Sequence, residues 1–226
     1  MLNYDVAPTL LERYVPAGCE LDAWEGRTFI SVVGFRFLST RVLGLPIPFH
    51  RNFEEVNLRF YVRRKHRGEL RRGVVFIKEL VPRHAIAWVA RRVYRENYVA
   101  LPMRHGIGDD GTGSRTVSYE WRRSTNWEGV RVRVSGEPTV TEDDSEEAFI
   151  TEHYWGYARQ PDGHTVEYQV EHPRWRVWRA CDASLRCDAA SLYGPAFADV
   201  LSGSLSTAFL ADGSAVTVPR GRPLPD

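Results

Sequence analysis

The sequence predicts a mostly β, α+β fold, in which an antiparallel sheet closes, or nearly closes, into a β-barrel with two or three peripheral helices. Apolar residues alternate with a period of two in most segments, and helical spacing is confined to short stretches. Strand–helix–strand units, which build parallel sheets, are scarce. Closure into a barrel would limit the number of exposed strand edges. The 226 residues contain no repeat and no linker, so we expect a single domain over residues 1–226.

The strands are expected in the following order along the chain. Residues 29–37 are apolar on both faces, as in a strand that is covered on two sides. Residues 54–63 alternate apolar and polar side chains, and they are expected to pair with 73–80 as a hairpin. The same alternation predicts further strands at 117–121, 130–134, 166–170 and 175–177, with a break at His172-Pro173 and a last hairpin turning at Asp212-Gly213.

Three segments are expected to be helical. Residues 86–96 have apolar side chains at helical spacing with arginines on the other side, which predicts an amphipathic helix of about three turns. Asp144 and Glu147 match a capping box, which predicts a second helix running on through Tyr157. A short helix is expected over 195–200. These three helices would lie outside the barrel.

Composition excludes several classes of function. The chain is 43% hydrophobic and 26% charged with a net charge of +1, which indicates a folded domain and no nucleic-acid partner. Cys19, Cys181 and Cys187 form no C-x-x-C pair and are odd in number, so neither a zinc site nor a disulfide framework is expected. We also expect no cofactor and no membrane partner. Without a signal peptide or a long apolar run, a cytoplasmic location is expected, and the oligomeric state stays open.

One strand face carries residues suited to binding an anion. Asn57, Arg59 and Tyr61 follow one another on the same side of strand 54–63, about 7 Å apart. A guanidinium can hold a carboxylate or phosphate through two hydrogen bonds, while an amide and a phenol fix its orientation. We therefore predict these three as ligand-binding residues for a small organic acid or similar anionic metabolite. The alternative, favoured by the flanking Glu55 and Arg63, is an ordinary solvent-facing strand side.

Several stretches, in this order, resemble an uncharacterised bacterial family of unknown function, the YqjF-like family. They are 15–22 (VPAGCELD), 57–62 (NLRFYV), 73–77 (GVVFI), 101–103 (LPM) and 170–175 (VEHPRW). The resemblance covers nearly the whole chain and implies an acetoacetate decarboxylase-like barrel. It implies no activity, because the family has none assigned.

Acetoacetate decarboxylases use a Schiff-base lysine whose pKa is lowered by an adjacent lysine and an apolar pocket. This chain has only Lys65 and Lys78, and the region expected to hold the catalytic lysine, 91–102, contains none. Lys78 is followed by Glu79, whose carboxylate is expected to raise the pKa of the amine. Schiff-base decarboxylation is therefore not expected, and Lys78 is interpreted as peripheral or ion-paired.

Two other functions stay open, so the sequence does not decide whether the protein is an enzyme. His172, beside Glu171 at a strand interruption, could act as a catalytic base, or Glu171 itself could. The alternative for His172 is a hydrogen bond to backbone, and His153 is interpreted as a packing residue with a satisfied nitrogen. No metal site is expected, since no three histidines cluster in the sequence. The last hypothesis is an interaction or scaffold protein with a packed core.

Overall fold

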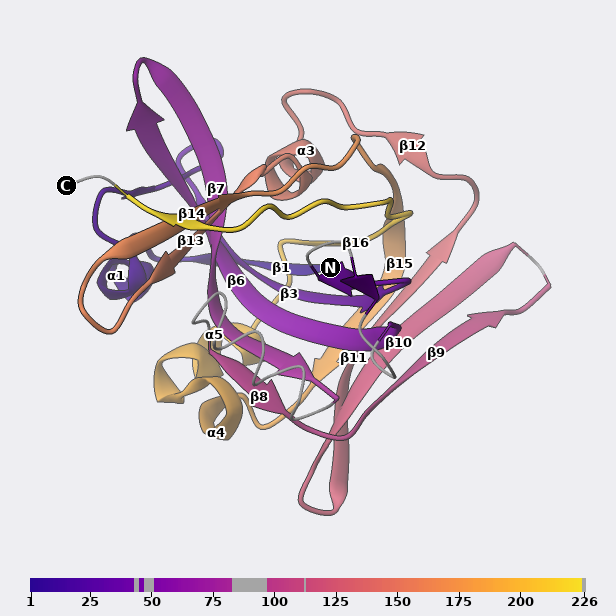
Figure 1. Cartoon of the computed structure of the whole chain (residues 1–226). Coiled ribbons are helices and arrows are strands. Elements are labelled where there is room, and N and C mark those ends of the chain that lie inside the picture. The colour runs from indigo at the N-terminus through magenta and orange to yellow at the C-terminus, as the bar shows by residue number, and fades with distance from the viewer. Residues whose placement is uncertain (43–44, 47–50, 83–96, 112, 225–226) are drawn as a thin grey trace.

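The computed structural model describes residues 1–42, 45–46, 51–82, 97–111 and 113–224, and most of the described secondary structure is β (Figure 1). One large sheet contains most of the strands. Their spatial order is β17 (Arg222–Pro223), β14 (Thr165–Gln169), β13 (Trp155–Arg159), β7 (Glu69–Val81), β6 (Phe53–His66), β3 (Thr28–Phe37), β1 (Leu2–Val6), β16 (Thr207–Ala211), β15 (Arg176–Arg186), β11 (Asn126–Ser135), β10 (Ser114–Arg123) and β9 (Met103–Asp109).

The remaining elements are short. Strands β2 (Glu20–Leu21), β8 (Tyr98–Ala100) and β12 (Thr139–Val140) pair with β6, β7 and β15, and β4 (Arg41–Val42) pairs with β5 (Leu45–Pro46). The described helices are α1 (Pro8–Leu11), η1 (Glu12–Tyr14), α3 (Glu146–Thr151), α4 (Ala189–Tyr193), η2 (Pro195–Phe197) and α5 (Ala198–Ser202). None of the described helices is long and apolar enough to cross a membrane.

The prediction of a mostly β fold with a few peripheral helices is confirmed, but the closed antiparallel barrel is not. Strand β7 pairs in parallel with both β13 and β8, so the sheet is mixed. The sheet is also open, because β9 and β17 stand at its two ends without pairing with each other in the described part of the chain. Parallel pairing needs a long connection. The many residues between β7 and β13 provide one, which the strand alternation alone does not reveal.

The strand predictions for the central hairpin and the meander are confirmed. Strands β6 and β7 pair antiparallel, as do β10 and β11. The predicted last hairpin is wrong: β16 pairs with β1 and β15, and the chain beyond Asp212-Gly213 leads to β17.

The helix predictions differ in their outcomes. The segment 86–96 lies outside the described residues, while η2 and α5 confirm the short helix at 195–200. Helix α3 is shorter than predicted, and its N-cap is Ser145, whose Oγ accepts the Ala148 N–H, instead of Asp144. Tyr157 lies in β13, beyond the helix end. A serine hydroxyl is as good an N-cap acceptor as a carboxylate, so the acidic run concealed the true first residue.

Strand β6 separates two apolar cores. Its even-numbered side chains from Val56 to Val62, among them Leu58 and Phe60, lie in the larger core with residues of α4. On the other face, Tyr61 lies in a smaller core with Phe149 and Ile150 of α3. Figure 1 shows α3 and α4 on opposite sides of β6. The strand is therefore covered on both faces, and the face predicted to be polar lies beneath α3.

Candidate functional site

The polar face of β6 is buried where the candidate residues lie. Asn57 is 2% exposed, Tyr61 is 1% exposed, and Arg59 between them is half-buried. Glu55 is also buried, and only from Arg63 onward is this side of the strand exposed. The alternative of an ordinary solvent-facing strand side is therefore wrong for Asn57 and Tyr61. The flanking charged residues suggested an exposed strand side, because α3, the helix that covers this face, is remote from β6 along the chain.

Arg59 connects β6 to the end of α3. Its Nη2 donates to the carbonyl oxygen of Ile150 at 3.1 Å, and its guanidinium carbon lies 5.5 Å from the Tyr61 ring centroid. The last carbonyls of a helix lack partners within the helix, so a cation there is favourable. The Nε of Arg59 is buried and has no hydrogen-bond partner among the described residues. The Nη2 of Arg59 is thus engaged within the fold, whereas its Nε is a donor without an acceptor among the described residues.

Asn57 lies on the same face, one step along the strand from Arg59. Its Nδ2 donates to Glu55 Oε1 at 3.1 Å. Its Oδ1 is buried and accepts no hydrogen bond from any residue that the structure describes. A buried polar atom without a partner is rare and requires an explanation. Here an unpaired acceptor and an unpaired donor occur on one strand face.

A chain of short hydrogen bonds fixes Tyr61. Its hydroxyl lies 2.6 Å from Ser31 Oγ, and Ser31 Oγ lies 2.6 Å from Asn3 Oδ1. Asn3 Nδ2 then bonds Thr207 Oγ1 at 2.9 Å, and Thr207 Oγ1 bonds Glu146 Oε1 at 2.5 Å. The network joins β6, β3, β1, β16 and α3. It holds the phenol ring in one position.

The carboxylate at one end decides the direction of every bond in this chain. An ionised Glu146 can only accept, so Thr207 donates to it and must accept from the amide nitrogen of Asn3. The amide oxygen of Asn3 therefore accepts from Ser31, which leaves Ser31 to accept from Tyr61. The hydroxyl hydrogen of Tyr61 is thus committed to Ser31, and only a lone pair of its oxygen remains.

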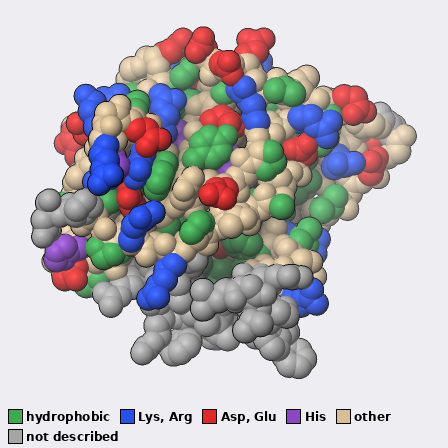
Figure 2. All heavy atoms as spheres, turned by 45° about the horizontal axis from the view of Figure 1, so that its top comes forward, with side chains coloured by type: hydrophobic (Ala, Val, Ile, Leu, Met, Phe, Trp, Pro, Cys, Tyr) green, Lys and Arg blue, Asp and Glu red, His purple; other side chains and the backbone are tan. Residues whose placement is uncertain are grey.

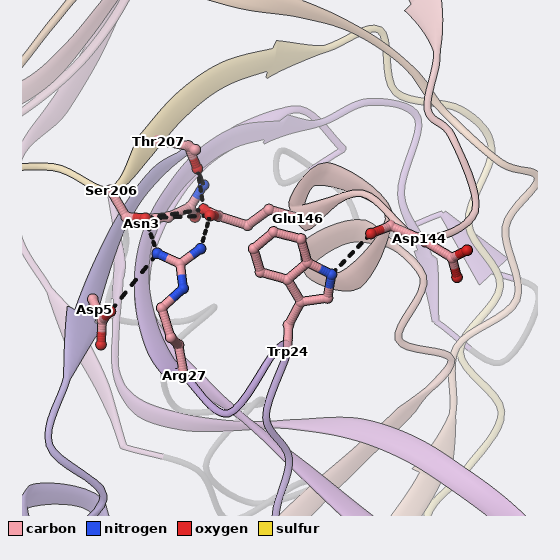
Figure 3. A network of polar contacts seen from close by, with 8 residues as sticks. All are labelled: Asn3, Asp5, Trp24, Arg27, Asp144, Glu146, Ser206 and Thr207. Carbon is pink, nitrogen blue, oxygen red and sulfur yellow. Dashed lines mark hydrogen bonds and ion pairs between the residues drawn. The ribbon is translucent and has the colours of Figure 1, made fainter.

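Glu146 is held in place by further donors (Figure 3). Arg27 Nη2 donates to its Oε2 at 3.0 Å, and Ser206 Oγ donates at 3.2 Å. Beside the ion pair of Arg27 and Glu146, Trp24 Nε1 donates to the carbonyl oxygen of Asp144 at 2.9 Å. Because these contacts fix both the first turn of α3 and the residues before it, the helix that covers Arg59 is firmly attached to the sheet.

A second buried polar group lies next to Tyr61, and sequence reasoning missed it. The His153 ring centroid is 4.7 Å from that of Tyr61, and His153 Nε2 lies 3.6 Å from Asp22 Oδ2. Both side chains are fully buried, and Arg72 Nε lies 3.1 Å from the same Asp22 oxygen. His153 does pack as predicted, but neither of its ring nitrogens makes a hydrogen bond to a described residue.

The electrostatics of this group follow from its burial. Burial lowers the pKa of His153, outweighing the opposite effect of Asp22, so the imidazole is neutral near pH 7. Burial acts to raise the pKa of Asp22, but the neighbouring His153 and Arg72 outweigh it, and the pKa is lowered. The position of Asp22 within the stretch 15–22 was the only signal in the sequence.

Two surface pockets flank Trp24. One, of about 530 Å³, is bordered by Arg72 and Arg174, and the other, of about 630 Å³, reaches Cys181. Figure 2 shows acidic and basic side chains interspersed over the face that carries α3, without a large patch of one sign. Arg59 lines neither pocket, so a ligand that contacts it must enter elsewhere or move side chains aside.

The described contacts of His172 and Glu171 are with residues outside β6. The His172 ring stacks between Tyr154 and Trp175, with centroids 4.9 and 4.2 Å away, and its Nδ1 lies 2.9 Å from the carbonyl oxygen of Pro173. Glu171 is exposed, and its backbone pairs with that of Thr217. The structure therefore does not bring these two residues together with Arg59.

Lys78 also points away from Arg59. It lies opposite Leu58, on the face of the larger core, and its Nζ donates to the carbonyl oxygen of Leu192. Burial lowers the pKa of the amine, and the charge of Arg123 lowers it further. The expectation that Glu79 would raise the pKa is wrong, because successive strand residues point to opposite faces. The ion pair expected for Lys78 is not found among the described residues either.

No cluster of metal-ligating side chains occurs in the described ranges of the chain. Groups of three or more His, Cys, Asp or Glu side chains with the spacing of a metal site were not found there. The three cysteines are free thiols.

Solved structures share the fold of this chain. Acetoacetate decarboxylase from Legionella pneumophila superposes with a TM-score of 0.60 at 13% identity, covering 100% of this chain and 83% of that one. The enduracididine biosynthesis enzyme MppR, complexed with pyruvate, gives 0.67 at 15% identity, covering 100% and 87%. An acetoacetate decarboxylase-like enzyme from Sphingomonas wittichii RW1 gives 0.60 at 14% identity, covering 97% and 85%. At these identities the likeness establishes the fold alone.

Sequence comparison confirms the resemblance inferred from the ordered stretches. Uncharacterized protein YqjF of Bacillus subtilis (strain 168) is 27% identical over 182 residues, which are 79% of this chain and 71% of that protein. The profile of the DUF2071 family, described as an uncharacterized conserved protein, matches residues 1–215. Because this match spans almost the whole chain, the protein belongs to the DUF2071 family.

Proposed function

We propose that this protein binds a small organic carboxylate at the polar face of β6, with Arg59 as the anchor. The observation that carries the proposal is the buried Nε of Arg59, which has no acceptor among the described residues. A carboxylate oxygen can accept a charge-assisted hydrogen bond from this Nε–H. The Nη2 bond to Ile150 holds the group in place for such contact.

The neighbours of Arg59 restrict which carboxylate fits. The phenol ring of Tyr61 supports the guanidinium, and its oxygen offers only a lone pair, since its hydrogen goes to Ser31. Asn57 Oδ1 is likewise an acceptor without a donor. The ligand should therefore carry a hydrogen-bond donor, such as a hydroxyl or an amine, beside its carboxylate. A 2-hydroxy acid or an amino acid satisfies this requirement better than a simple fatty acid does.

Relatives of the same fold support the choice of ligand class. MppR has been solved complexed with pyruvate and with the condensation product of pyruvate and imidazole 4-carboxaldehyde. Acetoacetate, named in the description of another neighbour, is also a small carboxylate. We infer that a similar anion is held here, without the Schiff-base lysine of the decarboxylases.

Calorimetric titration with lactate, pyruvate, alanine and butyrate tests the proposal. Loss of charge-assisted hydrogen bonds at about 1.5–3 kcal/mol should weaken binding by Arg59→Ala about 10- to 100-fold. Arg59→Lys keeps the charge but not the fork, so it should restore only part of the affinity. An equal dissociation constant in wild type and Arg59→Ala would remove Arg59 from the site.

A matched control separates binding from folding. Arg159 is an exposed arginine on β13, and Arg159→Ala should bind as the wild type does. Thermal unfolding without ligand measures how far the loss of the Ile150 contact destabilises Arg59→Ala. Only the affinity of folded protein is compared.

The other hypotheses are kept as alternatives. An acid–base enzyme using His172 or Glu171 draws no support from their described contacts, which include none of Asn57, Arg59 or Tyr61. A scaffold protein with a packed core would bind none of the four acids. The titration therefore separates the binding protein from the scaffold.

A further inference from the structure

A second group of polar side chains lies on the opposite side of the central strands, near the open end of the sheet. It comprises Arg36 on β3, Glu54 on β6, His105 on β9 and Tyr119 on β10. Arg36 is the cross-strand neighbour of Glu54, and His105 is the cross-strand neighbour of Tyr119. Four strands thus contribute one residue each. We call these residues the rim cluster.

Close packing brings the two strand pairs together. Tyr119 lies directly against Gly34, where a Cβ would come within 2.6 Å of the ring, so only glycine leaves room for the phenol. Across the same interface, Glu54 Oε1 and His105 Nδ1 are 2.6 Å apart. The side chains of His105 and Glu54 remain 27% and 17% exposed, so solvent reaches the group.

The contact with Glu54 fixes how His105 presents its other nitrogen. A carboxylate beside Nδ1 keeps a proton there, so Nε2 carries a lone pair when the ring is neutral and a proton when it is charged. No described residue makes a hydrogen bond to Nε2. The imidazole is thus oriented by a carboxylate and has its second nitrogen available, which is the geometry of a group that exchanges protons.

Arg36 provides an unengaged positive charge beside this pair. Its Nε is buried without a hydrogen-bond partner, and the guanidinium forms no ion pair within the described residues. Burial raises the pKa of Tyr119, and Arg36 and Glu54 both lie close enough to act on the phenol, Arg36 lowering its pKa and Glu54 raising it. Arg36 is half-buried, and a half-buried guanidinium without a carboxylate partner is uncommon, because its charge requires compensation.

From this geometry we propose that the rim cluster binds a small oxyanion, held by Arg36 and by Nε2 of protonated His105, with Tyr119 beside it. Glu54 is paired with His105 and not with Arg36, so a bound anion would supply the counter-charge that Arg36 lacks. Anion binding and His105 protonation must therefore favour each other. Glu54, Tyr119 and Arg36 are the titratable and charged groups that face the imidazole from β6, β10 and β3. This site is distinct from that at Arg59, which lies on the other face of β6.

NMR of the histidine ring signals tests this site with sulfate and acetate as probes, at constant ionic strength in chloride. The chain has seven histidines, and His105→Asn identifies the His105 signal by its loss. We expect saturable shifts of that signal with either anion, with tighter binding at lower pH because anion binding and protonation are linked. Each anion should also move the pH midpoint of the signal upward.

Variants separate a binding site from a structural contact. Arg36→Met should weaken the response of His105 at least tenfold, while the exposed Arg159→Met and the Arg59→Ala variant should leave it unchanged. His105→Asn keeps a donor toward Glu54, so it should fold as stably as the wild type. The proposal is overturned if neither anion shifts His105 saturably, or if Arg36→Met responds like the wild type. Since Arg59→Ala is measured in the same titration, a negative result at the rim cluster can be distinguished from a negative result for the carboxylate site at Arg59.

Discussion

The two faces of β6 are both buried, yet different interactions hold them. The even face is apolar, and Leu58 and Phe60 there are fully buried in the larger core. The odd face carries Asn57, Arg59 and Tyr61, which depend on hydrogen bonds to remote segments. Apolar burial is non-directional, whereas each buried polar group needs a partner in one geometry. The odd face can therefore hold unpaired atoms that select a ligand, whereas the apolar stretch of the even face around Leu58 and Phe60 cannot.

The largest effect should come from the even face. Phe60→Ala removes a fully buried ring, which should reduce the free energy of unfolding by about 3–5 kcal/mol. The exposed Arg63→Ala, on the same strand, should change it by less than about 0.5 kcal/mol. Urea denaturation followed by tryptophan fluorescence measures both. A small loss for Phe60→Ala would mean that the larger core is not packed around β6.

A smaller loss is expected when the polar network is broken. Ser31→Ala removes the acceptor of Tyr61 and the donor to Asn3, and a buried unsatisfied group costs about 1–3 kcal/mol. The double variant with Tyr61→Phe should be less destabilised than the sum of the two single variants, because both remove the same bond. Strict additivity in denaturation would contradict a connected network.

The pH dependence of stability tests the buried pair of His153 and Asp22. Because the pKa of His153 is lowered in the fold, the unfolded chain binds its proton first, and stability falls as pH drops below about 6.5. The limiting slope for one proton is about 1.4 kcal/mol per pH unit. The pKa of Asp22 is also lowered, so its contribution is present above about 3.9 and is lost on further acidification.

His153→Gln removes the first of these two transitions and keeps the second. Urea denaturation at a series of pH values should therefore show a flatter curve between about pH 7 and 5 for the variant. An identical curve for both proteins would show that His153 is not the group responsible.

The smallest expected effect concerns Lys78, which should form no adduct with a keto acid. Lys78 lies on the face opposite Arg59, so a carboxylate held at Arg59 cannot reach its amine. Borohydride reduction in the presence of pyruvate should leave the protein mass unchanged. A stable adduct on Lys78 would overturn both the exclusion of Schiff-base chemistry and the separation of the two faces.

The sequence predicts the local parts of this structure well. Alternation places β3, β6, β7, β10 and β11, because a strand with one or two apolar faces shows that pattern directly. It also shows that Asn57, Arg59 and Tyr61 share a face. Whether the sheet closes depends on which strands meet at its ends, and alternation contains no information about that.

The partners of the candidate residues could not be predicted. The bond between Asn3 and Thr207 joins positions 204 residues apart, and the Arg59 partner, Ile150, offers a backbone carbonyl that no side-chain pattern reveals. The His153 and Asp22 pair likewise joins distant segments. The sequence did not predict the rim cluster, because its four residues lie on four different strands and share no motif.

The most direct test of the account observes the Arg59 Nε–H itself. In a ¹⁵N-labelled protein, its signal should be assigned by loss in Arg59→Lys and followed while lactate is added. We predict a saturable downfield shift of the Nε proton, at the same dissociation constant that calorimetry gives, because a carboxylate accepts this hydrogen bond. Binding of lactate that leaves the Arg59 signal unmoved would contradict the central claim.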